Sequence, residues 1–230
     1  MAVPLMAGYG VVIPAFNAAA TIGAALNSVL AQTAKAEAIV VVDDGSTDDT
    51  AAVIDAMNLP VTVLRQDNTG PGSATTRGIA ALSTPLIATL DADDLWLADK
   101  IEKQLAYLGR HPGTAGVFTH WRTFRGDSPD LPDAASGAGW SRTTMMIRQE
   151  VVQSVGSIID PPGGRGEMID WIARVREAGF VLAMLDDVLA LRRIRPGSLS
   201  YGRDPARDRG YIQVARLAMQ RRAQNKAGSS

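Results

Sequence analysis

The feature that most constrains this chain is an alternation of short apolar segments with longer segments of helical periodicity. Residues 10–14, 38–42, 61–64 and 86–90 are apolar runs, each followed by an amphipathic or helix-capping segment. Strands that are apolar throughout are typical of a parallel sheet covered on both faces, and their alternation with helices predicts an α/β fold. In such sheets, ligands bind outside the carboxyl ends of the strands.

The second half of the chain has a less regular pattern. Further strands are expected at 114–119, 140–148, 180–185 and 188–194, and a surface loop at 126–139. Helices are expected at 18–32, after Ser46 or Thr47, and at 72–82, 98–108, from 149, 166–178 and 205–224. The sequence contains no internal repeat and no linker, so one domain is predicted.

Composition excludes several kinds of site. The 230 residues include no Cys and only two His, so a thiolate zinc site, a thiol nucleophile and a multi-histidine metal centre are ruled out. No apolar run reaches the roughly 20 residues of a membrane span, which predicts a cytoplasmic protein. Residues 192–230 carry ten basic and two acidic side chains, a net of +8, and the first 191 residues a net of −9. An acidic body of this kind is expected to bind a cation, and the basic end is expected to bind an anionic partner.

Two acidic clusters and one aromatic residue follow predicted strands. Asp91 and Asp93, separated by one residue, can turn toward one Mg²⁺ or Mn²⁺, whose shell is usually completed by phosphate oxygens. Asp44 can accept a hydrogen bond from a base or ribose, and Phe16 can stack on a flat ring. Taken singly, each feature also fits a structural role: an acidic turn, a helix cap (Asp43 above all) or a core aromatic.

Four blocks together resemble one family. The blocks are VIPAFN at 12–17, SVLAQT at 28–33, VVDDGSTD at 41–48 and LDADD at 90–94. In order and spacing they resemble family 2 glycosyltransferases of the GT-A fold. The resemblance is close over residues 10–108 and weaker from about 160 to 200. It implies a single Rossmann-like domain with a mostly parallel central sheet, flanked by helices and extended by a C-terminal helix.

The resemblance also implies a division of the chain. Residues 1–204 form the glycosyltransferase domain, with the nucleotide-sugar-binding half at 10–108 and the acceptor-binding half at 109–204. Residues 205–230 form a basic helix and tail, which is expected to lie on an anionic membrane surface, to dock back on the domain or to contact a second copy in a homodimer. The acceptor is a glycan, lipid, small molecule or peptide, and no nucleic acid is expected.

The resemblance assigns the donor site as well. The donor is a nucleotide-diphosphate sugar, most often linked to UDP or GDP, and its base lies against Pro14, Ala15 and Phe16, with Asn17 next to them. Asp44 reads the base edge. Asp91, with Ala92 beside it, lies nearer the ribose, and Asp91 and Asp93 hold Mn²⁺ or Mg²⁺. Transfer is expected to invert the anomeric carbon, with a general base at the acceptor hydroxyl.

The sequence departs from the family pattern at three places. The arginine that helps hold the nucleotide is replaced by Thr75, and Arg77 either substitutes for it or faces solvent. Met168 stands where relatives carry the base, which leaves Glu167 and Asp170, three residues apart on one helix face, as candidates. A histidine near the diphosphate is replaced by Arg195, whose guanidinium can clamp a phosphate.

Two alternatives accompany this interpretation. If Glu167 and Asp170 only cap their helix, the protein is an impaired relative that binds nucleotide sugar or glycan without turnover. A nucleotidyltransferase also pairs a parallel sheet with a divalent cation, but the segment after the first strand lacks the Gly-rich, basic loop that such an enzyme needs.

Overall fold

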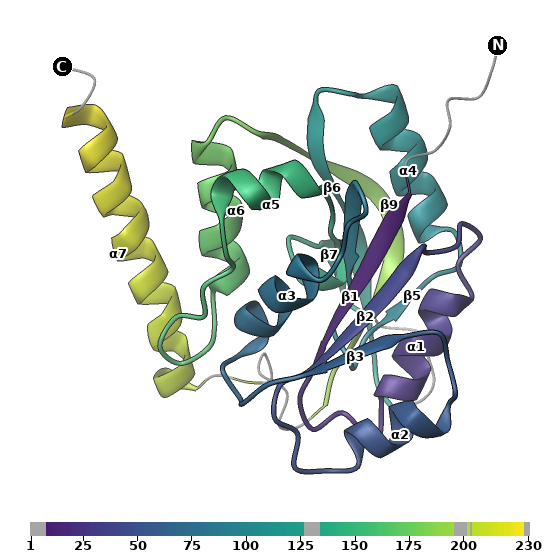
Figure 1. Cartoon of the computed structure of the whole chain (residues 1–230). Coiled ribbons are helices and arrows are strands. Elements are labelled where there is room, and N and C mark those ends of the chain that lie inside the picture. Colours follow the sequence, from purple (N-terminus) through teal and green to yellow (C-terminus); the bar gives the residue numbers. More distant parts are fainter. Residues whose placement is uncertain (1–7, 127–133, 196–201, 203, 228–230) are drawn as a thin grey trace.

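The computed structural model describes residues 8–126, 134–195, 202 and 204–227, which form a mixed α/β domain around one nine-stranded sheet (Figure 1). The strands are β1 (Tyr9–Ala15), β2 (Ala38–Asp43), β3 (Thr62–Arg65), β4 (Leu86–Thr89), β5 (Leu95–Trp96), β6 (Thr114–Phe124), β7 (Ser136–Ala138), β8 (Met146–Arg148) and β9 (Val181–Arg193). The helices are α1 (Ile22–Leu30), α2 (Thr50–Ala56), α3 (Pro71–Ala80), α4 (Lys100–Arg110), α5 (Gln149–Val155), α6 (Glu167–Glu177) and α7 (Pro205–Ala227), and a 3₁₀ turn, η1, covers Arg142–Thr144.

The strand order is β3-β2-β1-β4-β8-β6-β9-β5, with β7 paired to β6. The β3-β2-β1-β4 part is parallel throughout, as the apolar runs predicted. Beyond β4 the sheet is mixed: β8 runs antiparallel to both β4 and β6, whereas β9 runs parallel to β6. The carboxyl ends of β1, β2 and β4 therefore meet at one edge, next to the mixed half.

Helices cover both faces of the sheet, because alternate residues of the strands are buried on opposite sides. Val11 and Ile13 of β1 pack into one core with α1, α2 and α4. Val12 of the same strand packs into a second core with α3, α5 and α6, in which Trp171 is fully buried. This two-sided burial is the reason that β1 is apolar at every position.

Three expected elements of the second half differ in the structure. Residues 140–148 were expected to be one strand, but η1 interrupts them and only β8 pairs. Residues 180–194 were expected to be two strands, but β9 is continuous, because a bulge opposite Thr119 and His120 accommodates Asp186 and Asp187. The expected loop at 126–139 contains β7 in its described part, and residues 127–133 lie outside the described residues.

The C-terminal helix α7 lies beside α6 (Figure 1). Ion pairs hold it there: Arg221 contacts Asp170 and Glu177 of α6, and Asp208 contacts Arg165. Ile212 and Met219 remain exposed. Of the roles expected for this helix, docking on the domain is confirmed for the described residues, and contact with a membrane or a second copy stays a prediction. No helix in the described ranges combines the length and apolarity of a membrane span.

Candidate active site

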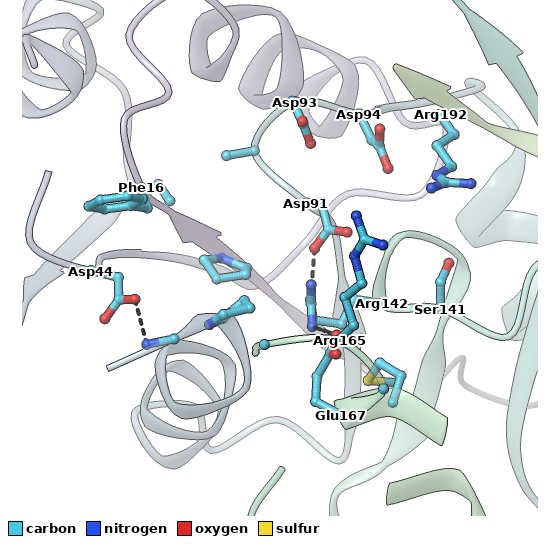
Figure 2. Close-up of a pocket in the computed structure, with 18 of the residues that line it drawn as sticks. Phe16, Asp44, Asp91, Asp93, Asp94, Ser141, Arg142, Arg165, Glu167 and Arg192 are labelled. Atoms are coloured by element: carbon cyan, nitrogen blue, oxygen red, sulfur yellow. Dashed lines mark hydrogen bonds and ion pairs between the residues drawn. The ribbon is translucent and has the colours of Figure 1, made fainter. Parts of the chain in front are cut away.

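A pocket of about 670 Å³ lies at the carboxyl ends of β1, β2 and β4 (Figure 2). One wall comes from the segments that follow these strands, and the opposite wall from the start of α6, the loop before it, η1 and the end of β9. Of the residues expected at the donor and acceptor sites, the following line it: Pro14, Ala15, Phe16, Asp44, Asp91, Ala92, Asp93, Glu167 and Arg195. The structure thus brings together residues that are up to 181 positions apart.

Phe16 and Asn17 follow β1 but do different things. The ring of Phe16 borders the pocket and is 47% exposed, so it is a platform open to a ligand and not a core residue. Asn17 adopts a left-handed conformation with φ of 48°. Its Oδ1 accepts hydrogen bonds from the amide and hydroxyl of Thr47, and it is not among the pocket-lining residues. Asn17 therefore fixes the turn that presents Phe16.

Asp44 lies at the pocket wall with a carboxylate that is already bound. Its Oδ1 accepts hydrogen bonds from Gln66 Nε2 at 2.7 Å and from the amide of Thr69 at 3.0 Å, and its Oδ2 from the amide of Gly70 at 2.9 Å. The neighbouring Asp43 accepts from the amide of Ser46, which is the turn-capping role considered for it. Asp44 thus shapes the loop that leads into α3 in addition to facing the pocket.

A carboxylate of this chain occupies the N-terminal end of α3. Asp160 accepts hydrogen bonds from the amides of Gly72 and Ser73, both at 2.8 Å. Gly70, which precedes α3, has φ of 103°, and a Cβ there would lie 2.6 Å from the Asp160 carboxyl carbon. No sequence pattern predicted this contact, because the partners are 87 and 88 residues apart.

Three acidic residues follow β4. Asp91 Oδ1 accepts a hydrogen bond from Arg142 Nε at 2.8 Å, and Asp93 Oδ2 pairs with Arg195 Nε at 3.2 Å. Burial and the charge of Asp91 raise the pKa of Asp93. Asp94 is buried and binds Thr143 Oγ1 at 2.5 Å and the amide of Arg193 at 2.8 Å, and burial together with its acidic neighbours raises its pKa well above the usual value. Asp94 therefore ties this loop to η1 and β9.

The donor set of Asp91 and Asp93 fits a hard divalent cation. Each residue lines the pocket and keeps one carboxylate oxygen, Oδ2 of Asp91 and Oδ1 of Asp93, without a hydrogen bond to the described residues. The described residues contain no group of three or more His, Asp or Glu that would enclose a metal. A cation here would take two protein ligands and complete its shell with phosphate and water, as Mg²⁺ does.

Arg142 is the central residue of the opposite wall, and the sequence analysis missed it. Figure 2 shows its guanidinium between Asp91 and Glu167. Nη1 binds Glu167 Oε1 at 2.5 Å, in addition to the bond from Nε to Asp91. Burial alone would lower the pKa of Arg142, but the two carboxylates raise it on balance, so the residue stays charged. No sequence motif marks it, because its partners are 51 and 25 residues away.

The two candidate bases lie in different surroundings. Glu167 lines the pocket at the N-terminal end of α6. Asp170 is buried between two arginines, with Oδ2 bound to Arg174 at 2.9 Å and Oδ1 to Arg221 at 2.9 Å, and it is not a pocket-lining residue. Of the two residues, only Glu167 reaches the pocket.

The two arginines expected to help at the donor site lie in different pockets. Arg77 donates to the carbonyl of Arg65 and lines a different, shallow hollow, and the buried Thr75 bonds the carbonyl of Pro71. Arg195 lines the main pocket beside Asp93. Of these two arginines, Arg195 lies where it could contact a ligand in the pocket, and Arg77 does not.

Further pocket residues were not singled out as site residues from the sequence. Arg165 lies on the loop before α6 and is held by Asp208 of α7 at 2.6 Å. Trp121, Trp140 and Tyr211 line the same pocket. Tyr211 belongs to α7, so this helix contributes to the wall of the pocket. Trp96, in contrast, is buried and donates to the carbonyl of Thr143, so it has a packing role.

Comparison with known proteins identifies the family. The model of "Glycosyl transferase family 2" matches residues 10–159, well over half of the chain. The chain belongs to glycosyl transferase family 2. The match begins at β1 and ends next to Asp160, so it includes the ends of β1, β2 and β4 at which the pocket lies.

Curated relatives and solved structures agree with this assignment. An uncharacterized glycosyltransferase of Nostoc sp. is 34% identical over 130 residues, which are 55% of this chain and 40% of that protein. The succinoglycan biosynthesis protein ExoU of Rhizobium meliloti is 42% identical over 103 residues, 43% of this chain and 30% of that protein. The chain thus matches less than half the length of these relatives.

Two solved structures show the same GT-A fold. TarS from S. aureus in complex with UDP-GlcNAc superimposes with a TM-score of 0.73 at 18% identity, over 92% of this chain and 65% of that one. A mannosyltransferase from Pyrobaculum calidifontis in complex with GDP-Man and Mn²⁺ gives a TM-score of 0.68 at 16% identity, over 85% of this chain and 59% of that one. The predicted fold class is confirmed.

Proposed function

We propose that this protein transfers a sugar from a nucleotide-diphosphate sugar to an acceptor hydroxyl. The observation that carries the proposal is the pocket itself: an exposed aromatic platform, a pair of carboxylates with free oxygens and a buried glutamate face one space of about 670 Å³. That volume lies within the usual range for small-molecule sites. Solved neighbours of the same fold bind UDP-GlcNAc and GDP-Man, which supports a nucleotide-sugar donor.

The donor's base would lie on the Phe16 side of the pocket. The ring of Phe16 offers a stacking surface, and the preceding residues Pro14 and Ala15 also line the pocket. Asp44 borders the same space, and its carboxylate is held at a fixed orientation by two backbone amides. Such a fixed acceptor suits an N–H group on the edge of a base.

Asp91 and Asp93 would hold Mn²⁺ or Mg²⁺ through their free oxygens. Bound there, the cation would offset negative charge on a departing nucleoside diphosphate, as a Lewis acid does. Arg195, which now pairs with Asp93, lines the pocket at the same place and can contact a phosphate oxygen. The neighbour that contains Mn²⁺ with GDP-Man supports a divalent metal for this fold.

Glu167 would act as the general base. In the proposed reaction the acceptor oxygen forms a bond to the anomeric carbon while the bond from that carbon to the diphosphate oxygen breaks. The bonding electron pair leaves with the nucleoside diphosphate, and the acceptor proton passes to a Glu167 carboxylate oxygen. Attack from the face opposite the diphosphate inverts the anomeric carbon. The position of Glu167 in the pocket wall at the start of α6 supports this role.

One observation favours a second candidate, a protein that binds nucleotide sugar without turnover. Met168 stands at the usual base position, and Glu167 is already bound to Arg142 at 2.5 Å. The two candidates share the donor site and differ only in product release.

The test has a binding step and a turnover step. Isothermal titration with UDP and GDP, with and without Mn²⁺, should show metal-dependent binding that Asp93→Asn weakens at least tenfold. A panel of nucleotide sugars should then show release of the nucleoside diphosphate, lost in Glu167→Gln, whereas the binding protein would release none. Absence of binding to any nucleoside diphosphate, with or without metal, would contradict both candidates.

A further inference from the structure

The most unusual feature of the pocket is a row of three buried or half-buried charges that crosses it. Asp91 at the end of β4, Arg142 of η1 and Glu167 of α6 are joined by contacts of 2.8 and 2.5 Å. The side chains of Arg142 and Glu167 are 8% and 10% exposed, and that of Asp91 is 28% exposed. The row connects the strand-end wall of the pocket to the wall that carries the proposed base.

The guanidinium is held from both sides. Its Nε and Nη1 each donate to a different carboxylate, and the planar fork fixes the angle between the two contacts. The backbone around it is fixed as well: the carbonyl of Arg142 accepts from Thr89 Oγ1 at 2.7 Å, and the next residue, Thr143, bonds Asp94. The position of the guanidinium therefore follows from β4 and its loop.

The contact decides where the Glu167 carboxylate lies. Arg142 Nη1 pairs with Glu167 Oε1 at 2.5 Å. The other charged groups near it are Asp160, whose charge interacts with Glu167, and the pocket-lining Arg165, which pairs with Asp208. Without Arg142, the nearly buried Glu167 would lose its counter-charge and the contact that fixes its rotamer.

We infer that Arg142 is a positioning residue for the proposed base Glu167. Its single guanidinium fixes the position of Glu167 relative to Asp91, the carboxylate at the proposed nucleotide-sugar site. This inference rests on the proposed function. Arg142 acts through Glu167: it holds the carboxylate in the orientation in which it faces the acceptor. A base displaced by about 1 Å loses on the order of 10²-fold in rate.

The test is a double-mutant cycle on turnover. Release of nucleoside diphosphate from the nucleotide sugar that the wild type uses is measured for Arg142→Met, Glu167→Gln and the double variant. We expect Arg142→Met to lower kcat about 10²-fold in the wild-type background and less than about threefold in the Glu167→Gln background, because a residue that acts through Glu167 has no further effect once the base is gone.

Arg142→Lys supplies a second measurement, because a purely structural role of Arg142 would not predict the recovery of kcat expected here. Lysine keeps the charge near Glu167 but cannot hold both carboxylates, so it should recover at least tenfold of the kcat lost in Arg142→Met. If Arg142→Met fails to fold, the same cycle is run with Arg142→Lys, whose smaller loss should likewise vanish in the Glu167→Gln background. Arg148→Met is the matched control: Arg148 belongs to β8, bonds the carbonyl of Thr114 and lies outside the pocket, so its kcat should stay within about twofold of wild type.

The outcomes separate the inference from the function. Equal losses from the Arg142 substitution in both backgrounds, or wild-type kcat in Arg142→Met, would overturn the positioning role while the proposed function stands. A wild-type protein that binds nucleoside diphosphate but releases none from any nucleotide sugar would overturn both.

Discussion

In the segment after β4 and in α6, the number of bound carboxylate oxygens separates the cation-binding candidates from structural residues. Asp91 and Asp93 each keep one oxygen free in the described structure, whereas both oxygens of Asp94 and of Asp170 are bound. The hydrogen bonds to both oxygens of Asp94 and Asp170 stabilise the fold. The distinction leads to different expectations for substitutions that look alike in the sequence.

Asp170→Asn should affect stability more than turnover. The substitution removes a buried charge between Arg174 and Arg221, and we expect the free energy of unfolding to fall by about 1–3 kcal/mol in urea denaturation. Glu167→Gln should show the reverse, with a loss of kcat on the order of 10²-fold or more. A larger loss of kcat in Asp170→Asn than in Glu167→Gln would reverse the choice of base.

Lys100 predicts a dependence of stability on pH. Its Nζ is buried, bonds Gln104 Oε1 at 2.8 Å and lies 4.1 Å from the Trp96 ring centroid, and burial lowers its pKa well below the usual value. Between the folded pKa and the unfolded value of about 10.4, the unfolded chain binds more protons, so stability rises with pH across that window.

Urea denaturation at pH 7.5 and 9.5 checks this prediction. The gain in unfolding free energy between the two pH values should be larger for the wild type than for Lys100→Met, which has no proton to release at this position. The comparison is independent of the stability that the substitution itself adds or removes. An equal gain in both proteins would show that Lys100 titrates normally.

At the residue scale, the pocket residues that follow the parallel strands could be predicted from the sequence, and those of the opposite wall could not. Phe16, Asp44 and Asp91 each follow an apolar strand, and parallel strands bring such positions to one edge. Arg142 follows no recognisable pattern, and its role depends on which long-range partners the sheet brings to it. Asn17 and Arg77 show the limit of prediction from motifs, because each lies near a motif and neither lines the pocket.

At the scale of elements, α7 is part of the pocket and not an appendage. Gly210 packs so closely on the loop before α6 that a Cβ there would lie 2.0 Å from the carbonyl oxygen of Arg165. The next residue, Tyr211, lines the pocket. A domain boundary at 204 would separate Arg165 from Asp208, which pairs with it.

Gly210→Ala should therefore destabilise the protein, although alanine favours a helix by about 1 kcal/mol over glycine. The added methyl group pushes α7 away from Arg165, and we expect a lower melting temperature and a lower kcat. Gly109→Ala in α4 is the matched control, since nothing lies within 4 Å of a Cβ there, and it should raise the melting temperature or leave it unchanged. A similar rise in both variants would show that α7 has room at Gly210.

The elements of the second half were harder to predict than those of the first, for a physical reason. Residues 140–148 and 181–193 owe their conformation to pairing with β4 and β6, which are distant in the chain. The exposed pair Asp186 and Asp187 looks like a turn in the sequence, but the bulge lets β9 continue through it. In the first half, the local hydrophobic periodicity and the pairing in the parallel sheet favour the same elements, so the sequence pattern was sufficient to predict them.

At the scale of the whole molecule, one sheet runs through both halves, and the pocket lies where its parallel and mixed parts meet. We therefore expect the chain to unfold as one unit. Tryptophan fluorescence reports Trp96, Trp121, Trp140 and Trp171, whereas far-UV circular dichroism also reports α1, α2 and α3. The two urea midpoints should coincide. A fluorescence transition that clearly precedes the dichroism transition would indicate that the second half unfolds separately.

The contact of Asp160 with α3 also has a consequence for the binding of a phosphorylated ligand. The amides at the start of a helix form an anion-binding site, and here the carboxylate of Asp160 already occupies it. A diphosphate bound as we propose would therefore find these amides occupied. Its charge would be balanced by the pocket-lining arginines or by a cation on Asp91 and Asp93, and not by the start of α3.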